Sequence, residues 1–134
     1  MSELRWHRDA RRVLLPVLIL APEPVIDLTS VPAQALVDTG STTSGVTTKI
    51  AERLRLPRLG KRPLASAHGE GQVERFLFKI ALPLEGQALP FVFEELMGFE
   101  LNDGFAFQAL LGMDVLGQCD FQTMRDGSCR LAFG

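Results

Sequence analysis

The sequence predicts an all-β fold made of short strands, with two short helices. Short apolar runs rich in Val, Ile, Leu and Phe alternate along the chain with turns that contain Pro, Gly, Asp or Asn. The dipeptide Asp126-Gly127 separates the last two of these runs, which is a strong indication of a β-hairpin. Only two segments have a helical pattern, and both are short.

Length and composition indicate one domain over residues 1–134. The chain has 134 residues, of which 46% are hydrophobic and 22% are charged, as in a soluble globular protein with an adequate core. The net charge is -2 at pH 7, and the block of basic residues that we recognise is N-terminal, at Arg5, Arg8, Arg11 and Arg12. We therefore expect no nucleic-acid partner. Residues 1–12 are predicted to form a flexible N-terminal arm.

The cysteine content favours a reducing compartment, and hence a cytoplasmic location. Cys119 and Cys129 are too few for a disulfide scaffold. A two-residue turn at Asp126-Gly127 would place Met124 opposite Cys129, far along the ladder from Cys119. We therefore expect no disulfide between the two cysteines.

The apolar segment Val13–Ala21 has two interpretations. It is too short to cross a bilayer, so no membrane span is expected. Because it follows several arginines, it could be the h-region of a signal peptide, which would make the protein exported. However, Ile19 occupies the place where a small residue should precede cleavage after Ala21. Pro16 and the β-branched residues suit an edge strand, which is the interpretation that we favour.

The other apolar runs predict strands that end at turn residues. Pro22 and Pro24 mark a bend after the first strand, and Pro32 precedes the strand that leads into the candidate site. Residues Gly98–Gly104 are predicted to form a loop. The predicted strands are Val13–Leu20, Val25–Leu28, Gln34–Val37, Arg62–Ala67, Val73–Leu82, Leu89–Leu96, Ala109–Leu111, Asp120–Met124 and Cys129–Phe133.

Each predicted helix follows a recognisable start. Thr47 or Thr48 can N-cap the first helix, and Pro57 ends it. Its apolar face consists of Ile50, Ala51 and Leu54. The second helix occupies one or two turns after Gly112, and Asp114 is expected to cap it.

The most informative stretch is Gln34–Gly45, where a buried strand runs into an acid. The apolar run Ala35-Leu36-Val37 stops at Asp38, and Thr39-Gly40-Ser41 follows. An acid at the end of a buried strand is costly unless neighbouring hydroxyl and N–H groups hold it. This small polar turn offers such groups, so the stretch is a candidate site.

Two separate motifs together resemble the retropepsin branch of the aspartic proteases, small enzymes that contribute one Asp-Thr-Gly per chain. They are Ala35-Leu36-Val37-Asp38-Thr39-Gly40-Ser41 and Leu110-Leu111-Gly112-Met113-Asp114-Val115-Leu116. The resemblance extends over about Val13–Phe133 and implies a closed β-barrel. Thr42 and Met113 replace the aspartate and arginine that viral members pair, so bacterial and cellular members are more similar. The final hairpin also extends beyond the end of viral chains, which argues against their four-stranded terminal dimer sheet.

The resemblance implies an aspartic endopeptidase that acts on peptides or proteins as a homodimer. Asp38 of each subunit would activate one water, with Thr39 in a hydrogen-bond network across the two loops. Gly40 would let its N–H reach the carboxylate, and Ser41 would bond that carboxylate from outside and lower the working pH. Leu111 and Gly112 would support the loop. No cofactor is expected, and the residues that could bind a metal have no ligand spacing, namely His7, His68, Cys119 and Cys129.

The polar segment Ser66–Gln72 reads as a hairpin tip, which the resemblance identifies with the flap that closes over substrate. The flap residues would be Ala67, His68, Gly69, Glu70 and Gly71. An ordinary exposed hairpin is an equally good interpretation of the same residues. His68 could tune a response to pH, although most loop histidines are simply solvated.

Two other functions are compatible with the motif. The chain could be an inactive retropepsin-like module for dimerisation or peptide binding. The stretch Val37–Ser44 also resembles the first phosphate loop of actin-like and sugar-kinase ATPases. Those folds need two large lobes and a second glycine-rich loop, which 134 residues do not supply.

Overall fold

The computed structural model describes residues 1–22, 29–66 and 69–134, and the side chains of residues 64–70 lie outside that description. Within these residues the chain is mostly strand, as predicted. The elements are β1 (Ser2–His7), β2 (Leu14–Leu20), β3 (Ser30–Val37), β4 (Gly45–Thr47), α1 (Thr48–Arg53), β5 (Arg58–Ser66), β6 (Gly69–Leu82), β7 (Phe91–Leu101), β8 (Ala109–Leu111), α2 (Met113–Leu116), β9 (Asp120–Thr123) and β10 (Ser128–Phe133).

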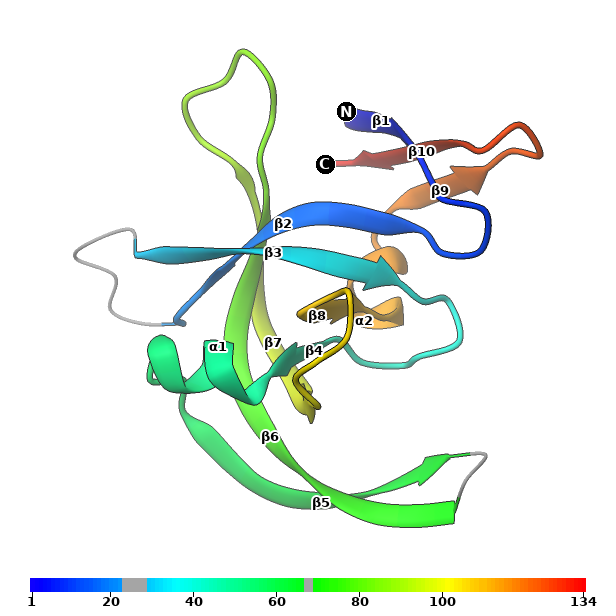
Figure 1. Cartoon of the computed structure of the whole chain (residues 1–134). Coiled ribbons are helices and arrows are strands. Elements are labelled where there is room, and N and C mark those ends of the chain that lie inside the picture. The colour runs from blue at the N-terminus through cyan, green and yellow to red at the C-terminus, as the bar shows by residue number, and fades with distance from the viewer. Residues whose placement is uncertain (23–28, 67–68) are drawn as a thin grey trace.

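The larger sheet closes on itself to form a barrel, which confirms the predicted fold class. Its described strands follow the order β2-β3-β8-β4-β7-β6-β5. Strand β2 also pairs with β6, with Leu18 opposite Ala81 and Leu20 opposite Lys79. Six strands therefore make the closed barrel, and β5 extends it as an outer strand of the long β5–β6 hairpin (Figure 1).

The barrel core comes from alternate residues of its strands. In β2, Leu15, Val17 and Ile19 are buried, and in β6 the side chains of Phe76 and Phe78 are buried. This period of two is the geometry of a strand with one face turned inward. Fully burying one such side chain contributes about 1.5–3 kcal/mol, so the core is the main source of stability.

The barrel brings β3 and β8 together at the candidate site. Strand β8 lies between β3, to which it is parallel, and β4, to which it is antiparallel. Val37 lies opposite Leu111 at the carboxyl ends of the two parallel strands. The loop that follows β3 must therefore cross the end of β8 before the chain returns as β4. This crossing places the Asp-Thr-Gly turn beside Gly112 and α2.

The prediction of a flexible N-terminal arm over residues 1–12 is wrong for Ser2–His7, which form strand β1. Strand β1 pairs with β10 in antiparallel register from Ser2–Phe133 to His7–Ser128. Leu4 and Trp6 of β1 pack against the core, and the Trp6 ring stacks on Phe121 with centroids 6.4 Å apart. Leu4 and Trp6 alternate with polar residues over only a few positions, which is a weak strand signal. The β9–β10 hairpin stabilises this short strand because β10 pairs with it.

The first long strand is an edge strand, as predicted, only over its first part. Strand β2 pairs with β3 along its length and with β6 over Leu18–Leu20. Pro16 is tolerated because it lies in the part of β2 that β6 does not reach, so its missing N–H removes no bond on that side. Strand β3 begins at Ser30 and includes Pro32, which was expected to precede it. The predicted strand Val25–Leu28 lies outside the described residues.

Several strands are longer than the apolar runs that predict them. Strand β7 runs through Leu101, so the first part of the predicted loop Gly98–Gly104 is strand. Strands β5 and β6 pair as far as Ser66 and Gly69, which makes the hairpin tip narrower than predicted. Backbone pairing extends these strands past the point where the apolar pattern stops.

The C-terminal hairpin forms as predicted, with its register displaced by one residue. Thr123, and not Met124, lies opposite Cys129. Gly127 has a φ of 95°, so it adds a third residue to the expected two-residue turn. Both Cys119 and Cys129 are free, and burial raises the pKa of the Cys119 thiol to about 11.

No helix in the described parts of the chain has the length and apolar character needed to cross a membrane.

Candidate active site

Asp38 lies where β3 leaves the barrel, and its backbone is fixed by β8. The Asp38 N–H donates to the Leu111 carbonyl at 3.0 Å, which continues the β3–β8 ladder by one residue. The Ser41 N–H then donates to the Asp38 carbonyl at 3.2 Å and closes the turn. The Asp38 side chain is half-buried. The site therefore holds an accessible carboxylate on a backbone that is bonded on both sides.

Gly40 approaches the Asp38 carboxylate as the sequence predicts. Its N–H donates to Asp38 Oδ1 at 2.9 Å. A Cβ at Gly40 would stand 3.2 Å from the same oxygen, closer than nearly all real contacts of that kind. Glycine thus allows a backbone N–H to orient the carboxylate without crowding it.

Ser41 does not bond the carboxylate, which corrects the prediction. Its Oγ donates to the Thr43 carbonyl at 2.7 Å. A hydroxyl has one hydrogen, so it cannot donate to Asp38 at the same time. Ser41 therefore stabilises the turn, and the predicted lowering of the working pH loses its basis.

Asp114 lies in the first turn of α2 and not at its N-cap, and its carboxylate bonds the end of the Asp38 loop as well as an N–H of α2. Its Oδ1 accepts from Ser44 Oγ at 2.7 Å and from the Val115 N–H at 2.9 Å, while its Oδ2 accepts from the Ser44 N–H at 2.9 Å. Ser44 is fully buried, and its Oγ accepts from the Gly112 N–H at 3.1 Å. The N-cap of α2 is Gly112, which has no side chain to offer. Asp114 and Ser44 therefore fasten the end of the loop to α2.

This pair was not recognised from the sequence. Ser44 and Asp114 are 70 residues apart, and neither belongs to a local pattern that predicts the other. What the sequence does contain is an acid in the motif after β8, and we interpreted that acid as a helix cap. Only the crossing of the loop over β8 brings Ser44 within reach.

Gly112 allows the closest approach between α2 and the loop. A Cβ at this position would lie 2.4 Å from the Thr43 carbonyl oxygen and 2.9 Å from the Ser41 carbonyl oxygen. With glycine there, the Met113 N–H donates to the Ser41 carbonyl at 2.7 Å. The supporting role that the resemblance implied for Leu111 and Gly112 is thus a backbone role, in which carbonyls and N–H groups meet directly.

Thr39 is exposed and has no hydrogen bond with any described residue of its own chain. Thr42 is also exposed, and its carbonyl accepts from the Asp114 N–H at 3.2 Å. The turn therefore has exposed residues at Thr39 and Thr42, while its backbone bonds to β8 and α2.

The predicted flap corresponds to the end of the β5–β6 hairpin at which the two strands are joined. In the view of Figure 1, this end and the β3–β4 loop lie on the same side of the barrel. Gly69, Glu70 and Gly71 belong to β6 and pair with β5. Ala67 and His68 lie outside the described residues. The structure thus provides a long hairpin on the correct side, and the contacts of its tip stay a prediction.

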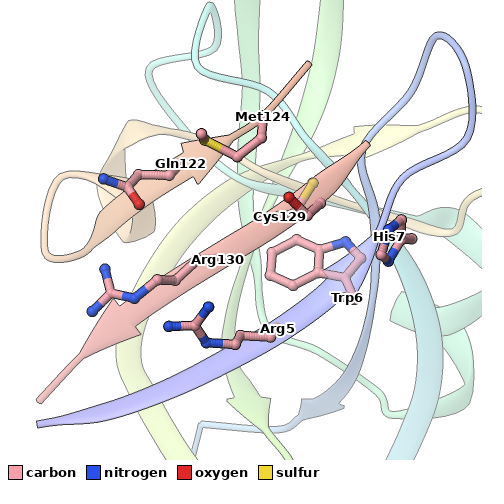
Figure 2. Close-up of a pocket in the computed structure, with 8 residues that line it drawn as sticks. Arg5, Trp6, His7, Gln122, Met124, Cys129 and Arg130 are labelled. Atoms are coloured by element: carbon pink, nitrogen blue, oxygen red, sulfur yellow. The ribbon is translucent and has the colours of Figure 1, made fainter. Parts of the chain in front are cut away.

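A separate cavity of about 690 Å³ opens on the terminal sheet, away from the Asp38 loop. Figure 2 shows Arg5 and Arg130 beside each other on its wall, where they are cross-strand neighbours. Glu3 accepts a hydrogen bond from each of these arginines, and these bonds hold the pKa of its carboxyl below the usual range. No lining residue comes from the β3–β4 loop. The cavity therefore does not contain the candidate catalytic acid.

Within the described residues, no group of three or more His, Cys, Asp or Glu side chains could hold a metal ion.

A closed β-barrel with an Asp-Thr-Gly loop that is fastened to a short helix defines a retropepsin-like aspartic protease fold. The chain belongs to the gag-polyprotein putative aspartyl protease family, whose model matches residues 26–118.

One solved structure shares the fold, and two others have lower similarity scores. A retropepsin-like aspartic protease from Rickettsia conorii matches with a TM-score of 0.65 and 18% identity, over 98% of this chain and 91% of that chain. EIAV protease complexed with the inhibitor HBY-793 has a TM-score of 0.46 and 23% identity, over 84% and 91% of the two chains. The retroviral protease-like domain of Ddi1 from Leishmania major has a TM-score of 0.44 and 20% identity, over 84% of this chain and 82% of that chain. No curated protein matches the chain significantly.

Proposed function

We propose that the protein is an aspartic endopeptidase that acts as a homodimer, with Asp38 from each subunit at one shared site. The observation that carries the proposal is the Asp38 loop itself. A backbone bonded to β8 and α2 presents a half-buried carboxylate, and its Oδ1 is oriented by the Gly40 N–H. The family and the fold agree with this role.

The second subunit is required by the chemistry. Peptide hydrolysis by this route needs two carboxylates that share one proton and hold one water. The chain contains one Asp-Thr-Gly, and Asp114, the acid fastened beneath the loop, is engaged by Ser44 and Val115. A twofold axis beside the exposed Thr39 would supply the second carboxylate. Thr39, which has no partner among the described residues of its own chain, is then available for the other loop.

In the proposed reaction, the ionised Asp38 takes a proton from the water as the water oxygen attacks the peptide carbonyl carbon. The protonated Asp38 of the other subunit donates its proton to the carbonyl oxygen. The resulting gem-diol then collapses: the C–N bond breaks as the nitrogen takes the proton of the now protonated Asp38, and one gem-diol hydroxyl gives its proton to the ionised Asp38. A carboxylic acid and an amine are released. The pair of aspartates finishes with one shared proton, as it began.

Cleavage of a mixed peptide library by the purified chain, from acidic to neutral pH, tests the proposal. We expect the native chain to cut internal peptide bonds and the Asp38→Asn variant to lose at least about a hundredfold in rate, since Asn cannot exchange the proton. Equal cleavage by both chains would refute the assignment. If the native chain forms dimers but cuts no peptide, the inactive module is the better description.

The cytoplasmic location stays a prediction. The incorporation of Leu14–Leu20 as a paired barrel strand supports a structural role for Val13–Ala21. Fractionation of cells that produce the tagged full chain would test it, and a mature exported form lacking this segment would contradict it.

A further inference from the structure

A second group of basic residues, separate from the N-terminal arginines, lies in the middle of the chain. Five exposed cations follow one another from the end of α1 through the first half of β5, and we call them the basic strip: Arg53, Arg55, Arg58, Lys61 and Arg62. No acid interrupts this stretch, although the whole chain has a net charge of -2. Apolar residues such as Leu54 and Leu59 separate the cations, so they do not form a continuous basic block in the sequence.

The cations of the strip lack acidic partners. The structure gives none of them an ion pair with a described residue, whereas Arg5 and Arg130 share Glu3 and Arg12 pairs with Asp9. Arg58 is the one cation of the strip with an aromatic contact, lying 5.9 Å from the centroid of the Phe76 ring. The strip therefore places cations on both faces of β5, since the consecutive residues Lys61 and Arg62 point to opposite sides of the strand. Glu74 lies opposite Lys61 on β6 without forming an ion pair with it.

Three members of the strip, Arg58, Lys61 and Arg62, belong to β5, which has a free sheet edge. Among the described strands β5 pairs only with β6, and it forms the last position in the strand order (Figure 1). An irregularity between Arg58 and Gly60 and the missing N–H of Pro63 interrupt this edge. Such features, together with like charges, prevent two copies of an edge from pairing. An extended chain of opposite charge meets no such repulsion.

We propose that the basic strip is a docking site for an extended acidic segment of the protein substrate, and the identification of that partner as substrate rests on the peptidase function proposed above. The segment would lie along β5, outside the Asp38 site, and would be held mainly by its carboxylates. Since the bulge and Pro63 limit backbone pairing, binding should depend strongly on salt.

The alternative polyanion, a nucleic acid, fits the surface less well. Sequence-tolerant binding of single strands uses exposed aromatic rings on which the bases stack. The strip has no aromatic residue, and the one exposed large aromatic among the described residues, Phe105, lies outside it. The net charge of -2 also gives no general attraction for a long polyanion.

Binding of a short fluorescent peptide of alternating Glu and Thr to the full-length Asp38→Asn chain tests the proposal. This chain cannot cut the peptide by the proposed route, so the assay gives its result whether or not the native chain is a peptidase. We expect Lys61→Gln combined with Arg62→Gln to weaken binding about fivefold at low ionic strength. The matched control is Arg11→Gln combined with Arg125→Gln, which removes two exposed cations elsewhere and should change binding little. Circular dichroism melts would verify that each variant folds.

Three results would overturn the proposal. The first is equal weakening by the two double variants, which would reduce the effect to net charge. The second is equal binding of a Gln–Thr peptide, which would remove the role of the carboxylates. The third is tighter binding of single-stranded RNA or of anionic vesicles than of the acidic peptide, with the same dependence on Lys61 and Arg62. Peptide cleavage without docking would leave the proposed peptidase intact and reject only this site.

Discussion

At the scale of single residues, Asp114 shows how a side chain outside the Asp-Thr-Gly motif shapes it. Its carboxylate accepts three hydrogen bonds, from the Ser44 N–H, Ser44 Oγ and the Val115 N–H. A carboxylate is the appropriate group here because every neighbour is a donor. The position needs acceptors on both oxygens and leaves no place for a donor of its own.

We expect Asp114→Asn to destabilise the protein by about 1–3 kcal/mol, because the amide NH₂ group must face one of these donors. Urea denaturation measures the change in the free energy of unfolding. The matched control is Asp103→Asn, which alters an exposed acid in the loop after β7. Equal stability of the two variants would show that the Asp114 bonds contribute nothing net.

At the scale of elements, β1 shows how a short strand is held by both faces. Its inner residues Leu4 and Trp6 pack on the core, while its outer residue Glu3 binds Arg5 and Arg130. The hydrogen bonds from these arginines lower the pKa of the Glu3 carboxyl. A group whose folded-state pKa is lowered stabilises the fold above its unfolded pKa, and this contribution is lost as the pH falls through the folded-state value.

The Glu3→Gln variant should therefore be slightly less stable than the native chain at neutral pH, and the difference should disappear in acid. Because Trp6 is the single tryptophan of the chain, its fluorescence during thermal unfolding reports on β1 directly. Glu52→Gln changes an exposed acid on α1 and should show no such dependence. A Glu3→Gln effect that persists unchanged below the folded-state pKa would contradict the charge argument.

At the scale of the whole molecule, the barrel fixes one acid loop per chain and leaves its outer side free. The loop is bonded to β8 and α2, and Thr39 is exposed with no hydrogen bond to a described residue of its own chain. If two such loops form the active unit, activity must depend on how the subunits pair.

Mixing tests this dependence. Adding an equal amount of Asp38→Asn chain to the native chain should lower cleavage by about half, since random pairing consumes native subunits in mixed dimers. Specific activity should also fall on dilution, in step with dissociation seen by sedimentation. The control is an equal amount of an unrelated protein. Constant specific activity in a solution of monomers would exclude the shared site.

The sequence by itself determined the features that depend on neighbouring residues. The end of a buried strand at Asp38, the Gly40 approach, the Thr47 cap of α1 and the Asp126-Gly127 hairpin all follow from local chemistry. The resemblance of two motifs added the barrel and the family, both of which the structure and the comparisons confirm.

Only the tertiary structure decided which distant segments meet. It gave β1 a partner in β10, brought Ser44 to Asp114, directed the Ser41 hydroxyl to the Thr43 carbonyl and left the basic strip on an open edge. The physical reason is that any neighbouring strand can supply backbone hydrogen bonds to a strand, and any nearby donor can bond a carboxylate. The local sequence shows that a group requires a hydrogen-bonding partner, and the closure of the barrel determines which residue lies close enough to be that partner.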